Sequence, residues 1–600
     1  MALLFFGLLG TRSLNEPDEG RYAEIAREMV ETGNWLVPHI WYVPHLDKPP
    51  FTYWAVATSL SIFGVNEWAV RLPLALAGLS AAWATFLFVR SLAGAAAARA
   101  SALVLGTSAL YWVMARMLTT DIFLTQFIAW AIYFFWRSWR SLDALGEGSQ
   151  TSEVSSQKSD AKEEVADPIG DARARAARRS FGWQLAAWTA MAGGVLTKGP
   201  IALVIPLAAF GALLVWRRHT SGARLSVLLF GALAGVPLFA VLALPWFWLV
   251  WESVPHSFEF MVKGQIVGHA VQAAAKNRAQ PFWFFGPVLL VGFLPWTPLL
   301  GWLWRRSHWA SLDARKQEGW LLLSVWAGVT FLMFSINSAK LPHYILPMFP
   351  ALAALVALRW PAFGTPVSKP AGEANSGERA GSETGAPGWT WRLLPAAALV
   401  PLIAFPLACE FVFKVQVSEA FWVRLIPLGV LALLQVVHLK GRLWSARVRT
   451  FWTVGLSGLG LLTLAALVPL VETKLRSNQT LKPLGLALQK AAGDGDLIVI
   501  RGRIPQGLPF YAHPVISATR RPYLSGLPEH RMPFEFTGNK ARFGDRVLPD
   551  DEAYAKLLRG PQRVLVVGFK GTFVSARQEK RERPLRLLAE VGDWELFTNQ

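Results

Sequence analysis

The chain has 600 residues, of which 53% are hydrophobic and only 16% are charged. These proportions exclude an ordinary soluble protein and an intrinsically disordered one, and they indicate a membrane protein. The net charge of +19 is more typical of Lys and Arg in cytoplasmic loops than of nucleic-acid binding.

Apolar segments predict about thirteen membrane-spanning helices, because a span needs roughly 20 apolar residues. They begin near Ala2, Leu72, Ala100, Asp121, Phe181, Pro200, Leu225, Phe282, Gly319, His343, Leu393, Ala420 and Phe451. The first apolar segment, residues 1–10, is short for a span and lacks the features of a signal peptide, so we interpret it as an incomplete first helix. We therefore expect a polytopic α-helical membrane protein with a transmembrane domain of residues 1–471.

The short loops carry basic residues unequally. One alternating set contains clusters such as Arg217, Arg218 and Arg224, whereas the other contains single residues such as Lys198. The positive-inside rule places the richer set, and with it the amino terminus, in the cytoplasm. Two polar linkers, residues 141–177 and 364–388, then lie on the cytoplasmic side and are interpreted as flexible loops.

The first outer loop, residues 11–71, is long and patterned. Asn15 as N-cap, Pro17 in the first turn and Gly33 as a stop predict a helix. Its apolar residues share one stripe, so we expect an amphipathic helix in the plane of the membrane interface, with Glu24, Arg27, Glu28 and Glu31 on its other sides. A second apolar stretch, Phe51–Phe63, is too short to span and is expected at the interface too.

The last part of the chain, residues 472–600, predicts a soluble α/β domain. Residues 497–500 and 564–567 are short apolar runs typical of buried strands, and residues 481–492 and 553–558 have helical patterns. With an odd number of spans, this domain is extracytoplasmic.

Asp18 and Glu19 are adjacent carboxylates that follow the first predicted membrane helix by a few residues. One interpretation is structural, because acidic residues in a first helical turn are favoured by the helix dipole. The other is catalytic: a carboxylate held at the membrane surface that orients or deprotonates an acceptor hydroxyl.

Two lysines stand in rigid outer turns. Lys48 precedes Pro49 and Pro50, which stiffen the backbone, and Lys198 precedes Gly199 and Pro200. Each is either an interfacial or loop lysine or a cation that binds a lipid phosphate.

Asp121 lies at the membrane edge, where an ionisable group is costly unless it is paired or solvated. It either pairs with Arg116 or serves as a second carboxylate of a site. The run that contains Lys340, His343 and Tyr344 carries hydrogen-bond donors that suit phosphate oxygens.

The sequence leaves the cofactor open, with a divalent metal as one candidate. A cysteine-based metal site is excluded, because Cys409 is the single cysteine. In the outer loop of residues 252–281, His256 or His269 could bind a metal together with Asp47, although no ligand spacing is diagnostic.

All these polar residues share the predicted outer side of the membrane. Carboxylates and cations gathered at a lipid boundary suit a substrate with a membrane-embedded tail and an anionic head. A lipid or solute transporter is the rival hypothesis, but the paired halves with interrupted helices that are typical of transporters are not evident. A structural protein that binds through its outer domain would need no carboxylates.

Five short motifs of the chain resemble those of a known family. Residues 18–22 (Asp-Glu-Gly-Arg-Tyr), 48–50 (Lys-Pro-Pro), 71–73 (Arg-Leu-Pro), 196–200 (Leu-Thr-Lys-Gly-Pro) and 340–344 (Lys-Leu-Pro-His-Tyr) are similar to motifs of the GT-C class of polyprenyl-phosphate-dependent glycosyltransferases. The bacterial lipid A aminoarabinose transferases are the nearest branch, and the protein O-mannosyltransferases are more distant. The resemblance covers roughly residues 1–360.

The resemblance implies a sugar donor on a polyprenyl phosphate, an acceptor in the cell envelope and transfer with inversion at the outer face of the inner membrane. It further implies that Asp18 is the key carboxylate and Asp121 the second acid, and that Lys48 and Tyr344 hold the lipid phosphate. One departure is that residues 260–269 contain no arginine, whereas the aminoarabinose transferases carry a His/Arg pattern in that loop.

Overall fold

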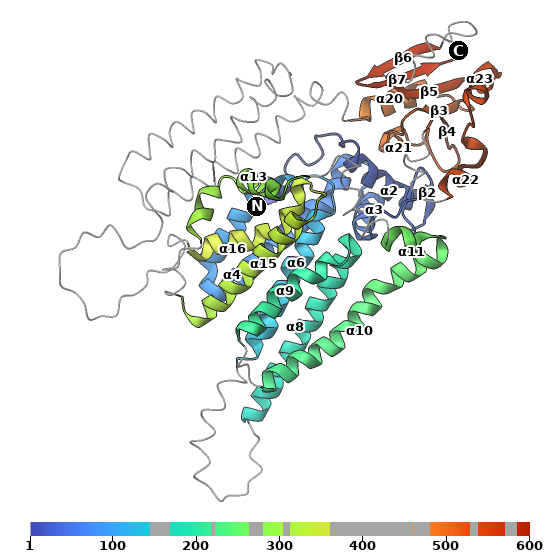
Figure 1. Cartoon of the computed structure of the whole chain (residues 1–600). Helices are drawn as coiled ribbons and strands as arrows, with labels where there is room; N and C mark the ends of the chain where they lie inside the picture. The colour runs from blue at the N-terminus through green and yellow to red at the C-terminus, as the bar shows by residue number, and fades with distance from the viewer. Residues whose placement is uncertain are drawn as a thin grey trace, which may run out of the picture.

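The computed structural model describes residues 2–143, 168–217, 222–262, 280–303, 312–359, 455, 480–527, 538–570 and 585–600. The described residues form a bundle of long helices and a smaller α/β domain, with a short-helix region between them (Figure 1). The helices up to residue 359 are α1 (Ala2–Phe6), α2 (Asp18–Thr32), α3 (Phe51–Phe63), α4 (Glu67–Gly106), α5 (Ala109–Met114), α6 (Asp121–Ser141), α8 (Pro168–Lys198), α9 (Ile201–Trp216), α10 (Gly222–Ser253), α11 (Ser257–Glu259), η2 (Phe282–Phe284), α13 (Phe285–Gly292), η3 (Thr297–Trp302), α15 (Ala314–Ile336), η4 (Pro342–Met348) and α16 (Phe349–Arg359).

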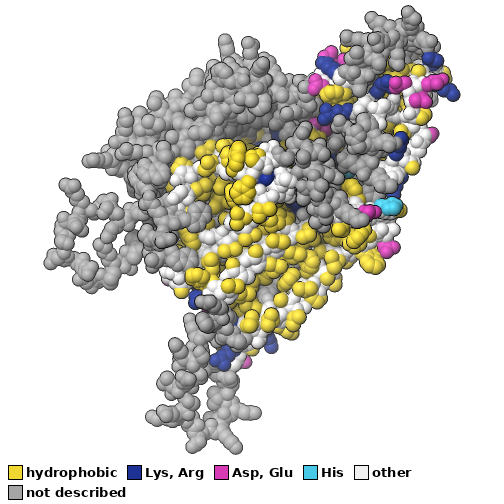
Figure 2. Space-filling model, viewed as in Figure 1, with side chains coloured by type: hydrophobic (Ala, Val, Ile, Leu, Met, Phe, Trp, Pro, Cys, Tyr) yellow, Lys and Arg dark blue, Asp and Glu magenta, His cyan; other side chains and the backbone are white. Residues whose placement is uncertain are grey.

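The bundle has the surface of a membrane-spanning protein. Within the described residues, four helical segments are long and apolar enough to cross a membrane: Glu67–Gly106, Arg224–Ser253, Ala314–Ile336 and Pro342–Arg359. Hydrophobic side chains cover the visible face of the bundle, whereas charged side chains gather on the α/β domain and near the opposite tip (Figure 2). The chain is a polytopic helical membrane protein, because such an apolar exterior is stable only in contact with lipid.

Several predicted spans coincide with helices, and α6 begins at Asp121 as predicted. The second and third predicted spans are joined in α4, which turns sharply at Gly94, where φ is 80°. Helix α8 begins at Pro168, so the last part of the linker predicted at residues 141–177 is helical. That segment is rich in Ala and Arg, which are strong helix formers. The spans predicted from Leu393, Ala420 and Phe451, and the linker of residues 364–388, lie outside the described residues except for residue 455.

Helix α2 corrects the expectation of an amphipathic helix in the plane of the membrane interface, because charged residues of its polar face are buried within the protein. Glu24, Arg27 and Glu28 are buried, and Arg27 bonds both carboxylate oxygens of Glu24 at 2.6 and 2.8 Å. Glu28 accepts hydrogen bonds from the backbone N–H groups of Trp41 and Tyr42, next to the hairpin of β1 (His39–Ile40) and β2 (Val43–Pro44). The helix is buried on both faces because its charges find partners within the protein.

The helix bounds in this region otherwise follow local signals. Gly33 ends α2 in the left-handed conformation with φ of 69°, as its position predicted. The start was wrong by a few residues: α2 begins at Asp18 after Pro17, and Asn15 lies outside the helix. The second apolar stretch forms the helix α3, which packs between α2 and α4.

The α/β domain contains a five-stranded mixed sheet in the order β4-β3-β5-β7-β6. The two predicted strands are confirmed as β3 (Leu497–Arg501) and β5 (Val564–Phe569), and the two predicted helices as α20 (Lys482–Ala491) and α23 (Asp551–Arg559). β3 pairs in parallel with both β4 (Tyr523–Ser525) and β5, whereas β7 (Trp594–Thr598) is antiparallel to β5 and β6 (Arg586–Val591). The remaining helices are α21 (Leu508–Ala512), α22 (Asn539–Phe543) and η7 (Gly544–Arg546).

The α/β domain docks on the first loop of the bundle. Glu16 accepts a hydrogen bond from the Gly507 N–H at 2.8 Å, and Glu31 accepts one from the Ala518 N–H at 3.0 Å. Asn539 donates to the Pro44 carbonyl at 2.9 Å. Because these contacts join segments almost 500 positions apart, α2 is held between the sheet domain and the bundle (Figure 1).

Candidate active site

Asp18 and Glu19 are neighbours in sequence but differ in environment. The Asp18 side chain is 39% exposed and pairs with Arg21 at 2.8 Å, one helical turn away. Glu19 is fully buried and pairs with Arg12 at 2.8 Å and Arg71 at 3.1 Å. Only Asp18 is therefore accessible to a substrate.

The buried environment of Glu19 explains its charge state. Its carboxylate also accepts backbone N–H groups from Asn15 and Leu118, so both oxygens are occupied. Burial alone would raise the pKa of Glu19, but the charges of Arg12 and Arg71 outweigh burial and hold the pKa well below its ordinary value. We infer that Glu19 has a structural role, because it ties the first loop to α4 and to the turn before α6. It is therefore not one of the catalytic residues that we propose.

Arg21 connects Asp18 to the Lys48 turn. The Arg21 guanidinium binds Asp18, and the charge of Asp47 acts on the same guanidinium. Asp47 in turn lies 3.4 Å from the ammonium of Lys48. The first carboxylate and the first candidate phosphate ligand thus belong to one charged cluster.

Asp121 is the centre of a second cluster. Its carboxylate is buried and lies 2.6 Å from the Lys198 Nζ atom and 3.5 Å from the His343 Nε2 atom. The structure therefore pairs Asp121 with Lys198, whereas Arg116 donates instead to the carbonyl groups of Leu4, Phe5 and Gly7.

Tyr344 and Lys48 adjoin this second cluster. The Lys198 ammonium lies 4.2 Å from the centre of the Tyr344 ring, and the His343 and Tyr344 rings are 5.2 Å apart. The charges of Asp47 and Lys48 both act on Lys198. Four parts of the chain therefore come together around Asp121. They are the start of α6, the end of α8, the helix η4 and the loop that precedes α3.

Lys340 was predicted to belong to this group, but in the structure it forms a hydrogen bond elsewhere. Its Nζ atom donates to the Gln280 carbonyl at 2.9 Å, which ties the loop after α15 to the segment before η2. No described contact joins Lys340 to Asp121 or Lys198.

The described residues contain no group of three or more His, Cys, Asp or Glu side chains that could hold a metal ion. Asp47 pairs with Lys48, and His256 lies just before the short helix α11. His269 lies outside the described residues. The candidate metal site therefore remains a sequence-based hypothesis.

Sequence reasoning missed Arg21 and His45. Arg21 was identifiable, because its spacing of three from Asp18 favours an ion pair on one helical face. His45 is buried close to Asp47, Arg21 and Lys48, and its Nε2 atom has no hydrogen-bond partner among the described residues. Burial lowers the pKa of His45 to about 3, so the ring is neutral at physiological pH, and no local signal predicts that burial.

The arrangement suits chemistry at an anionic group. Lys48, Lys198 and the His343–Tyr344 pair supply donors and positive charge, which stabilise phosphate oxygens. Asp18 offers an accessible carboxylate oriented by Arg21. The site lies in a helix bundle on which an α/β domain is docked.

Comparisons with known proteins identify the class of this protein. A family model described as dolichyl-phosphate-mannose-protein mannosyltransferase matches residues 47–144. The fold resembles the crystal structure of ArnT from Cupriavidus metallidurans bound to undecaprenyl phosphate, with a TM-score of 0.73 and 21% identity over 100% of this chain and 96% of that chain. The resemblance to the GT-C class that the motifs indicated is confirmed.

Two curated relatives are undecaprenyl phosphate-alpha-4-amino-4-deoxy-L-arabinose arabinosyl transferases. The one from Erwinia tasmaniensis is 31% identical over 59% of this chain and 57% of its own length. The one from Aeromonas salmonicida is 34% identical over 59% of this chain and 58% of its own length. The chain thus spans little more than half the length of these relatives.

Proposed function

We propose that this protein is an inner-membrane glycosyltransferase that moves a sugar from a polyprenyl-phosphate donor to an acceptor in the cell envelope. The observation that carries the proposal is the convergence of Lys48, Lys198, His343 and Tyr344 around the buried Asp121. Cations at a lipid boundary suit a donor whose isoprenoid tail lies in the membrane and whose phosphate lies at its edge.

The donor phosphate is the leaving group in this proposal. An acceptor oxygen attacks the anomeric carbon, and the bond from that carbon to the phosphate oxygen breaks with its electron pair on the phosphate. A single displacement inverts the anomeric configuration. Lys48, Lys198, His343 and Tyr344 stabilise the charge that develops on the polyprenyl phosphate, and the buried Asp121 keeps Lys198 charged and in position.

Asp18 acts on the acceptor. Its exposure and its contact with Arg21 suit a carboxylate that orients an incoming group. If the acceptor is a hydroxyl, Asp18 takes its proton, whereas an acceptor phosphate is already ionised and needs only to be positioned.

The names of the relatives support a proposal for the sugar donor. Because the similar proteins are named as aminoarabinose transferases that use undecaprenyl phosphate, we propose a lipid-linked amino sugar or related pentose or hexose as the donor. Lipid A is the first acceptor to test, ahead of other glycolipids, glycans and proteins.

The proposed topology has about thirteen spans in residues 1–471, since each needs roughly 20 apolar residues, with the amino terminus in the cytoplasm. Residues 472–600 then form a periplasmic domain. The docking of α21 and α22 on the first loop supports one common side for this domain and the site.

Mass spectrometry of envelope lipids and glycans tests the function. A deletion strain is complemented either with the wild-type protein or with Asp18→Asn at equal membrane levels. We expect a sugar-sized mass on the acceptor that falls about 100-fold or more in Asp18→Asn, because a positioned acid–base group contributes at least that factor. Glu252→Gln, an exposed carboxylate change at the end of α10, is the matched control and should retain the product.

Equal product in the wild type and Asp18→Asn would reject Asp18 as the acid–base residue. If no sugar-bearing product depends on the protein at all, the transporter hypothesis replaces the enzyme.

A further inference from the structure

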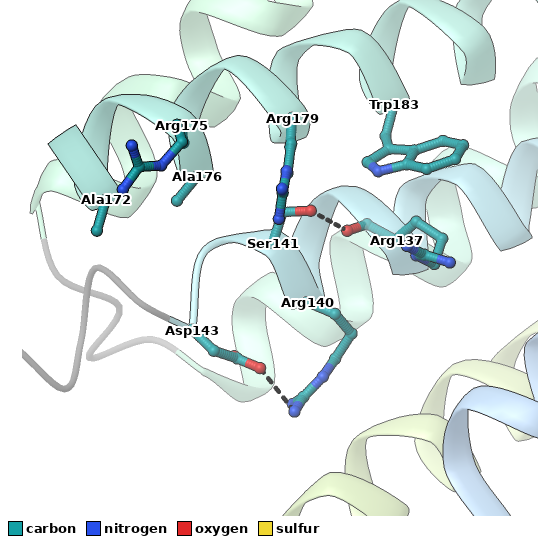
Figure 3. Close-up of a pocket in the computed structure, with 9 residues that line it drawn as sticks. All are labelled: Arg137, Arg140, Ser141, Asp143, Ala172, Arg175, Ala176, Arg179 and Trp183. Carbon is teal, nitrogen blue, oxygen red and sulfur yellow. Dashed lines mark hydrogen bonds and ion pairs between the residues drawn. The ribbon is translucent and has the colours of Figure 1, made fainter. Parts of the chain in front are cut away.

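A groove of about 680 Å³ lies at the end of the bundle away from the α/β domain. It is formed where α6 ends, in the turn that follows, and along the first half of α8 (Figure 3). None of its lining residues belongs to the candidate active site.

The groove is strongly basic. Arg137 and Arg140 of α6 and Arg175 and Arg179 of α8 line it, against the single carboxylate of Asp143 (Figure 3). Asp143 pairs with Arg140 at 2.6 Å. Arg140 also lies 3.6 Å from Glu318. In the described part of the chain, no carboxylate lies within ion-pair distance of the other three arginines, so the described lining has more positive than negative charge.

The walls of the groove are held in place. Beneath it, the buried hydroxyl groups of Ser138 and Ser180 lie 2.8 Å apart and join α6 to α8. The Arg137 guanidinium lies 4.9 Å from the centre of the Trp183 ring and donates to the Tyr133 hydroxyl at 3.1 Å. These contacts fix one guanidinium before any ligand arrives, which reduces the entropy lost on binding.

The position of the groove points to a lipid rather than a soluble anion. Trp183 stacks on Phe134 with ring centres 5.7 Å apart, so an aromatic surface borders the arginines. The hydrophobic face of the bundle reaches towards this tip, where the charged side chains begin (Figure 2). Aromatic and basic side chains gather at the membrane–water interface, which is where phospholipid headgroups lie.

We propose that this groove binds the headgroup of an anionic phospholipid from the leaflet at that end of the bundle. The arginines donate to the phosphate oxygens, and the acyl chains run along the apolar face. Basic pockets between membrane-spanning helices bind such headgroups because guanidinium groups match phosphate oxygens in charge and geometry. The proposal does not rest on the glycosyltransferase activity.

Native mass spectrometry of the delipidated full-length protein tests the proposal. The protein is titrated with phosphatidylglycerol, with phosphatidylcholine and with inorganic phosphate in separate experiments. We expect Arg175→Ala/Arg179→Ala to weaken phosphatidylglycerol binding about 30-fold, because each arginine near an anionic surface contributes about a factor of five. Phosphatidylcholine should bind weakly to every variant.

The matched control is Arg173→Ala/Arg178→Ala. It removes the same charge from the same helix, and both residues are exposed and outside the groove. It should bind phosphatidylglycerol as the wild type does. Equal losses in the two double variants, or equal binding of the two lipids, would overturn the proposal. Displacement of bound phosphatidylglycerol by millimolar inorganic phosphate would assign the groove to a soluble anion and also overturn it.

Discussion

Asp18 and Glu19 both carry a carboxylate group, but they have different roles. Neighbouring side chains on a helix point about 100° apart, so the two carboxylates meet different surroundings. Asp18 points outward to Arg21, whereas Glu19 points inward between Arg12 and Arg71. A buried carboxylate between two guanidinium groups stabilises the fold only while all three are charged.

We therefore expect Glu19→Gln to lower the free energy of unfolding by about 3–5 kcal/mol, because it removes the carboxylate shared by the buried Arg71 and the half-buried Arg12. Asp18→Asn should change it by about 0.5 kcal/mol or less, since the side chain is substantially exposed. The stability of the two purified variants can be compared by thermal unfolding in detergent. Equal stability of the two variants would contradict the structural role of Glu19.

Asp121 and Lys198 should behave as a coupled pair. Asp121→Asn and Lys198→Met each leave one charge buried without its partner, so each should reduce stability and donor binding. In the double variant the loss should be smaller than the sum by about 0.5–3 kcal/mol. A double-mutant cycle of unfolding free energies measures this coupling, and additive losses would show that the two side chains act independently.

Among the elements, the contact between α2 and the loop before α21 depends on glycine. A methyl group on Gly507 would lie 2.7 Å from the Gly20 Cα atom and 2.2 Å from a Glu16 carboxylate oxygen. The backbone of the α/β domain can approach α2 only because neither glycine has a side chain.

Gly507→Ala should therefore destabilise this interface by about 1–3 kcal/mol, the usual cost of forcing extra atoms into a packed contact. Limited proteolysis of the α/β domain reports the loosened interface. Gly493→Ala is the control, because a methyl group there meets no atom closer than 3.6 Å. Protection equal to that of the wild type in Gly507→Ala would exclude a tight contact.

The same interface should depend on pH through Glu16. Burial raises the pKa of Glu16 from 4.5 to about 7. Between these pH values the unfolded chain releases a proton that the folded chain retains, so stability falls as the pH rises and the loss is complete above about 7. Glu16→Gln is neutral throughout and should remove this part of the pH dependence. Melting temperatures measured from pH 4 to 8 in both proteins test it, and parallel profiles would contradict it.

The whole molecule has an apolar middle between two charged ends (Figure 2). The α/β domain and the candidate active site share one end, and the arginine groove lies at the other. A bilayer around the apolar middle would separate these ends, so they should face different compartments.

Cysteine labelling tests this arrangement. In a Cys409→Ser background, a cysteine at Glu552 of α23 should react with a membrane-impermeant thiol reagent in cells with a permeabilised outer membrane. A cysteine at Arg173 of α8 should react only after the inner membrane is broken. Both native side chains are exposed, so accessibility does not favour either position. Labelling of both positions in intact spheroplasts would reject the proposed topology.

Local sequence patterns were enough to predict the helical bundle, α6 and the buried strands β3 and β5. Each depends on residues that are near neighbours in the chain, such as an apolar run with a proline or glycine at its end. The motif residues Asp18, Lys48, Asp121, Lys198, His343 and Tyr344 were also recognisable, because polar groups at the edge of apolar segments are costly.

Only the tertiary structure decided which of these residues act together. Asp121 meets Lys198 and His343 because α6, α8 and η4 pack side by side, and Glu19 is buried because Arg71 reaches it from a position 52 residues away. The polar face of α2 is covered by the hairpin and by a domain that follows hundreds of residues later. Hydrophobic pattern is a property of short segments, whereas the partners of a charged side chain depend on contacts between distant ones.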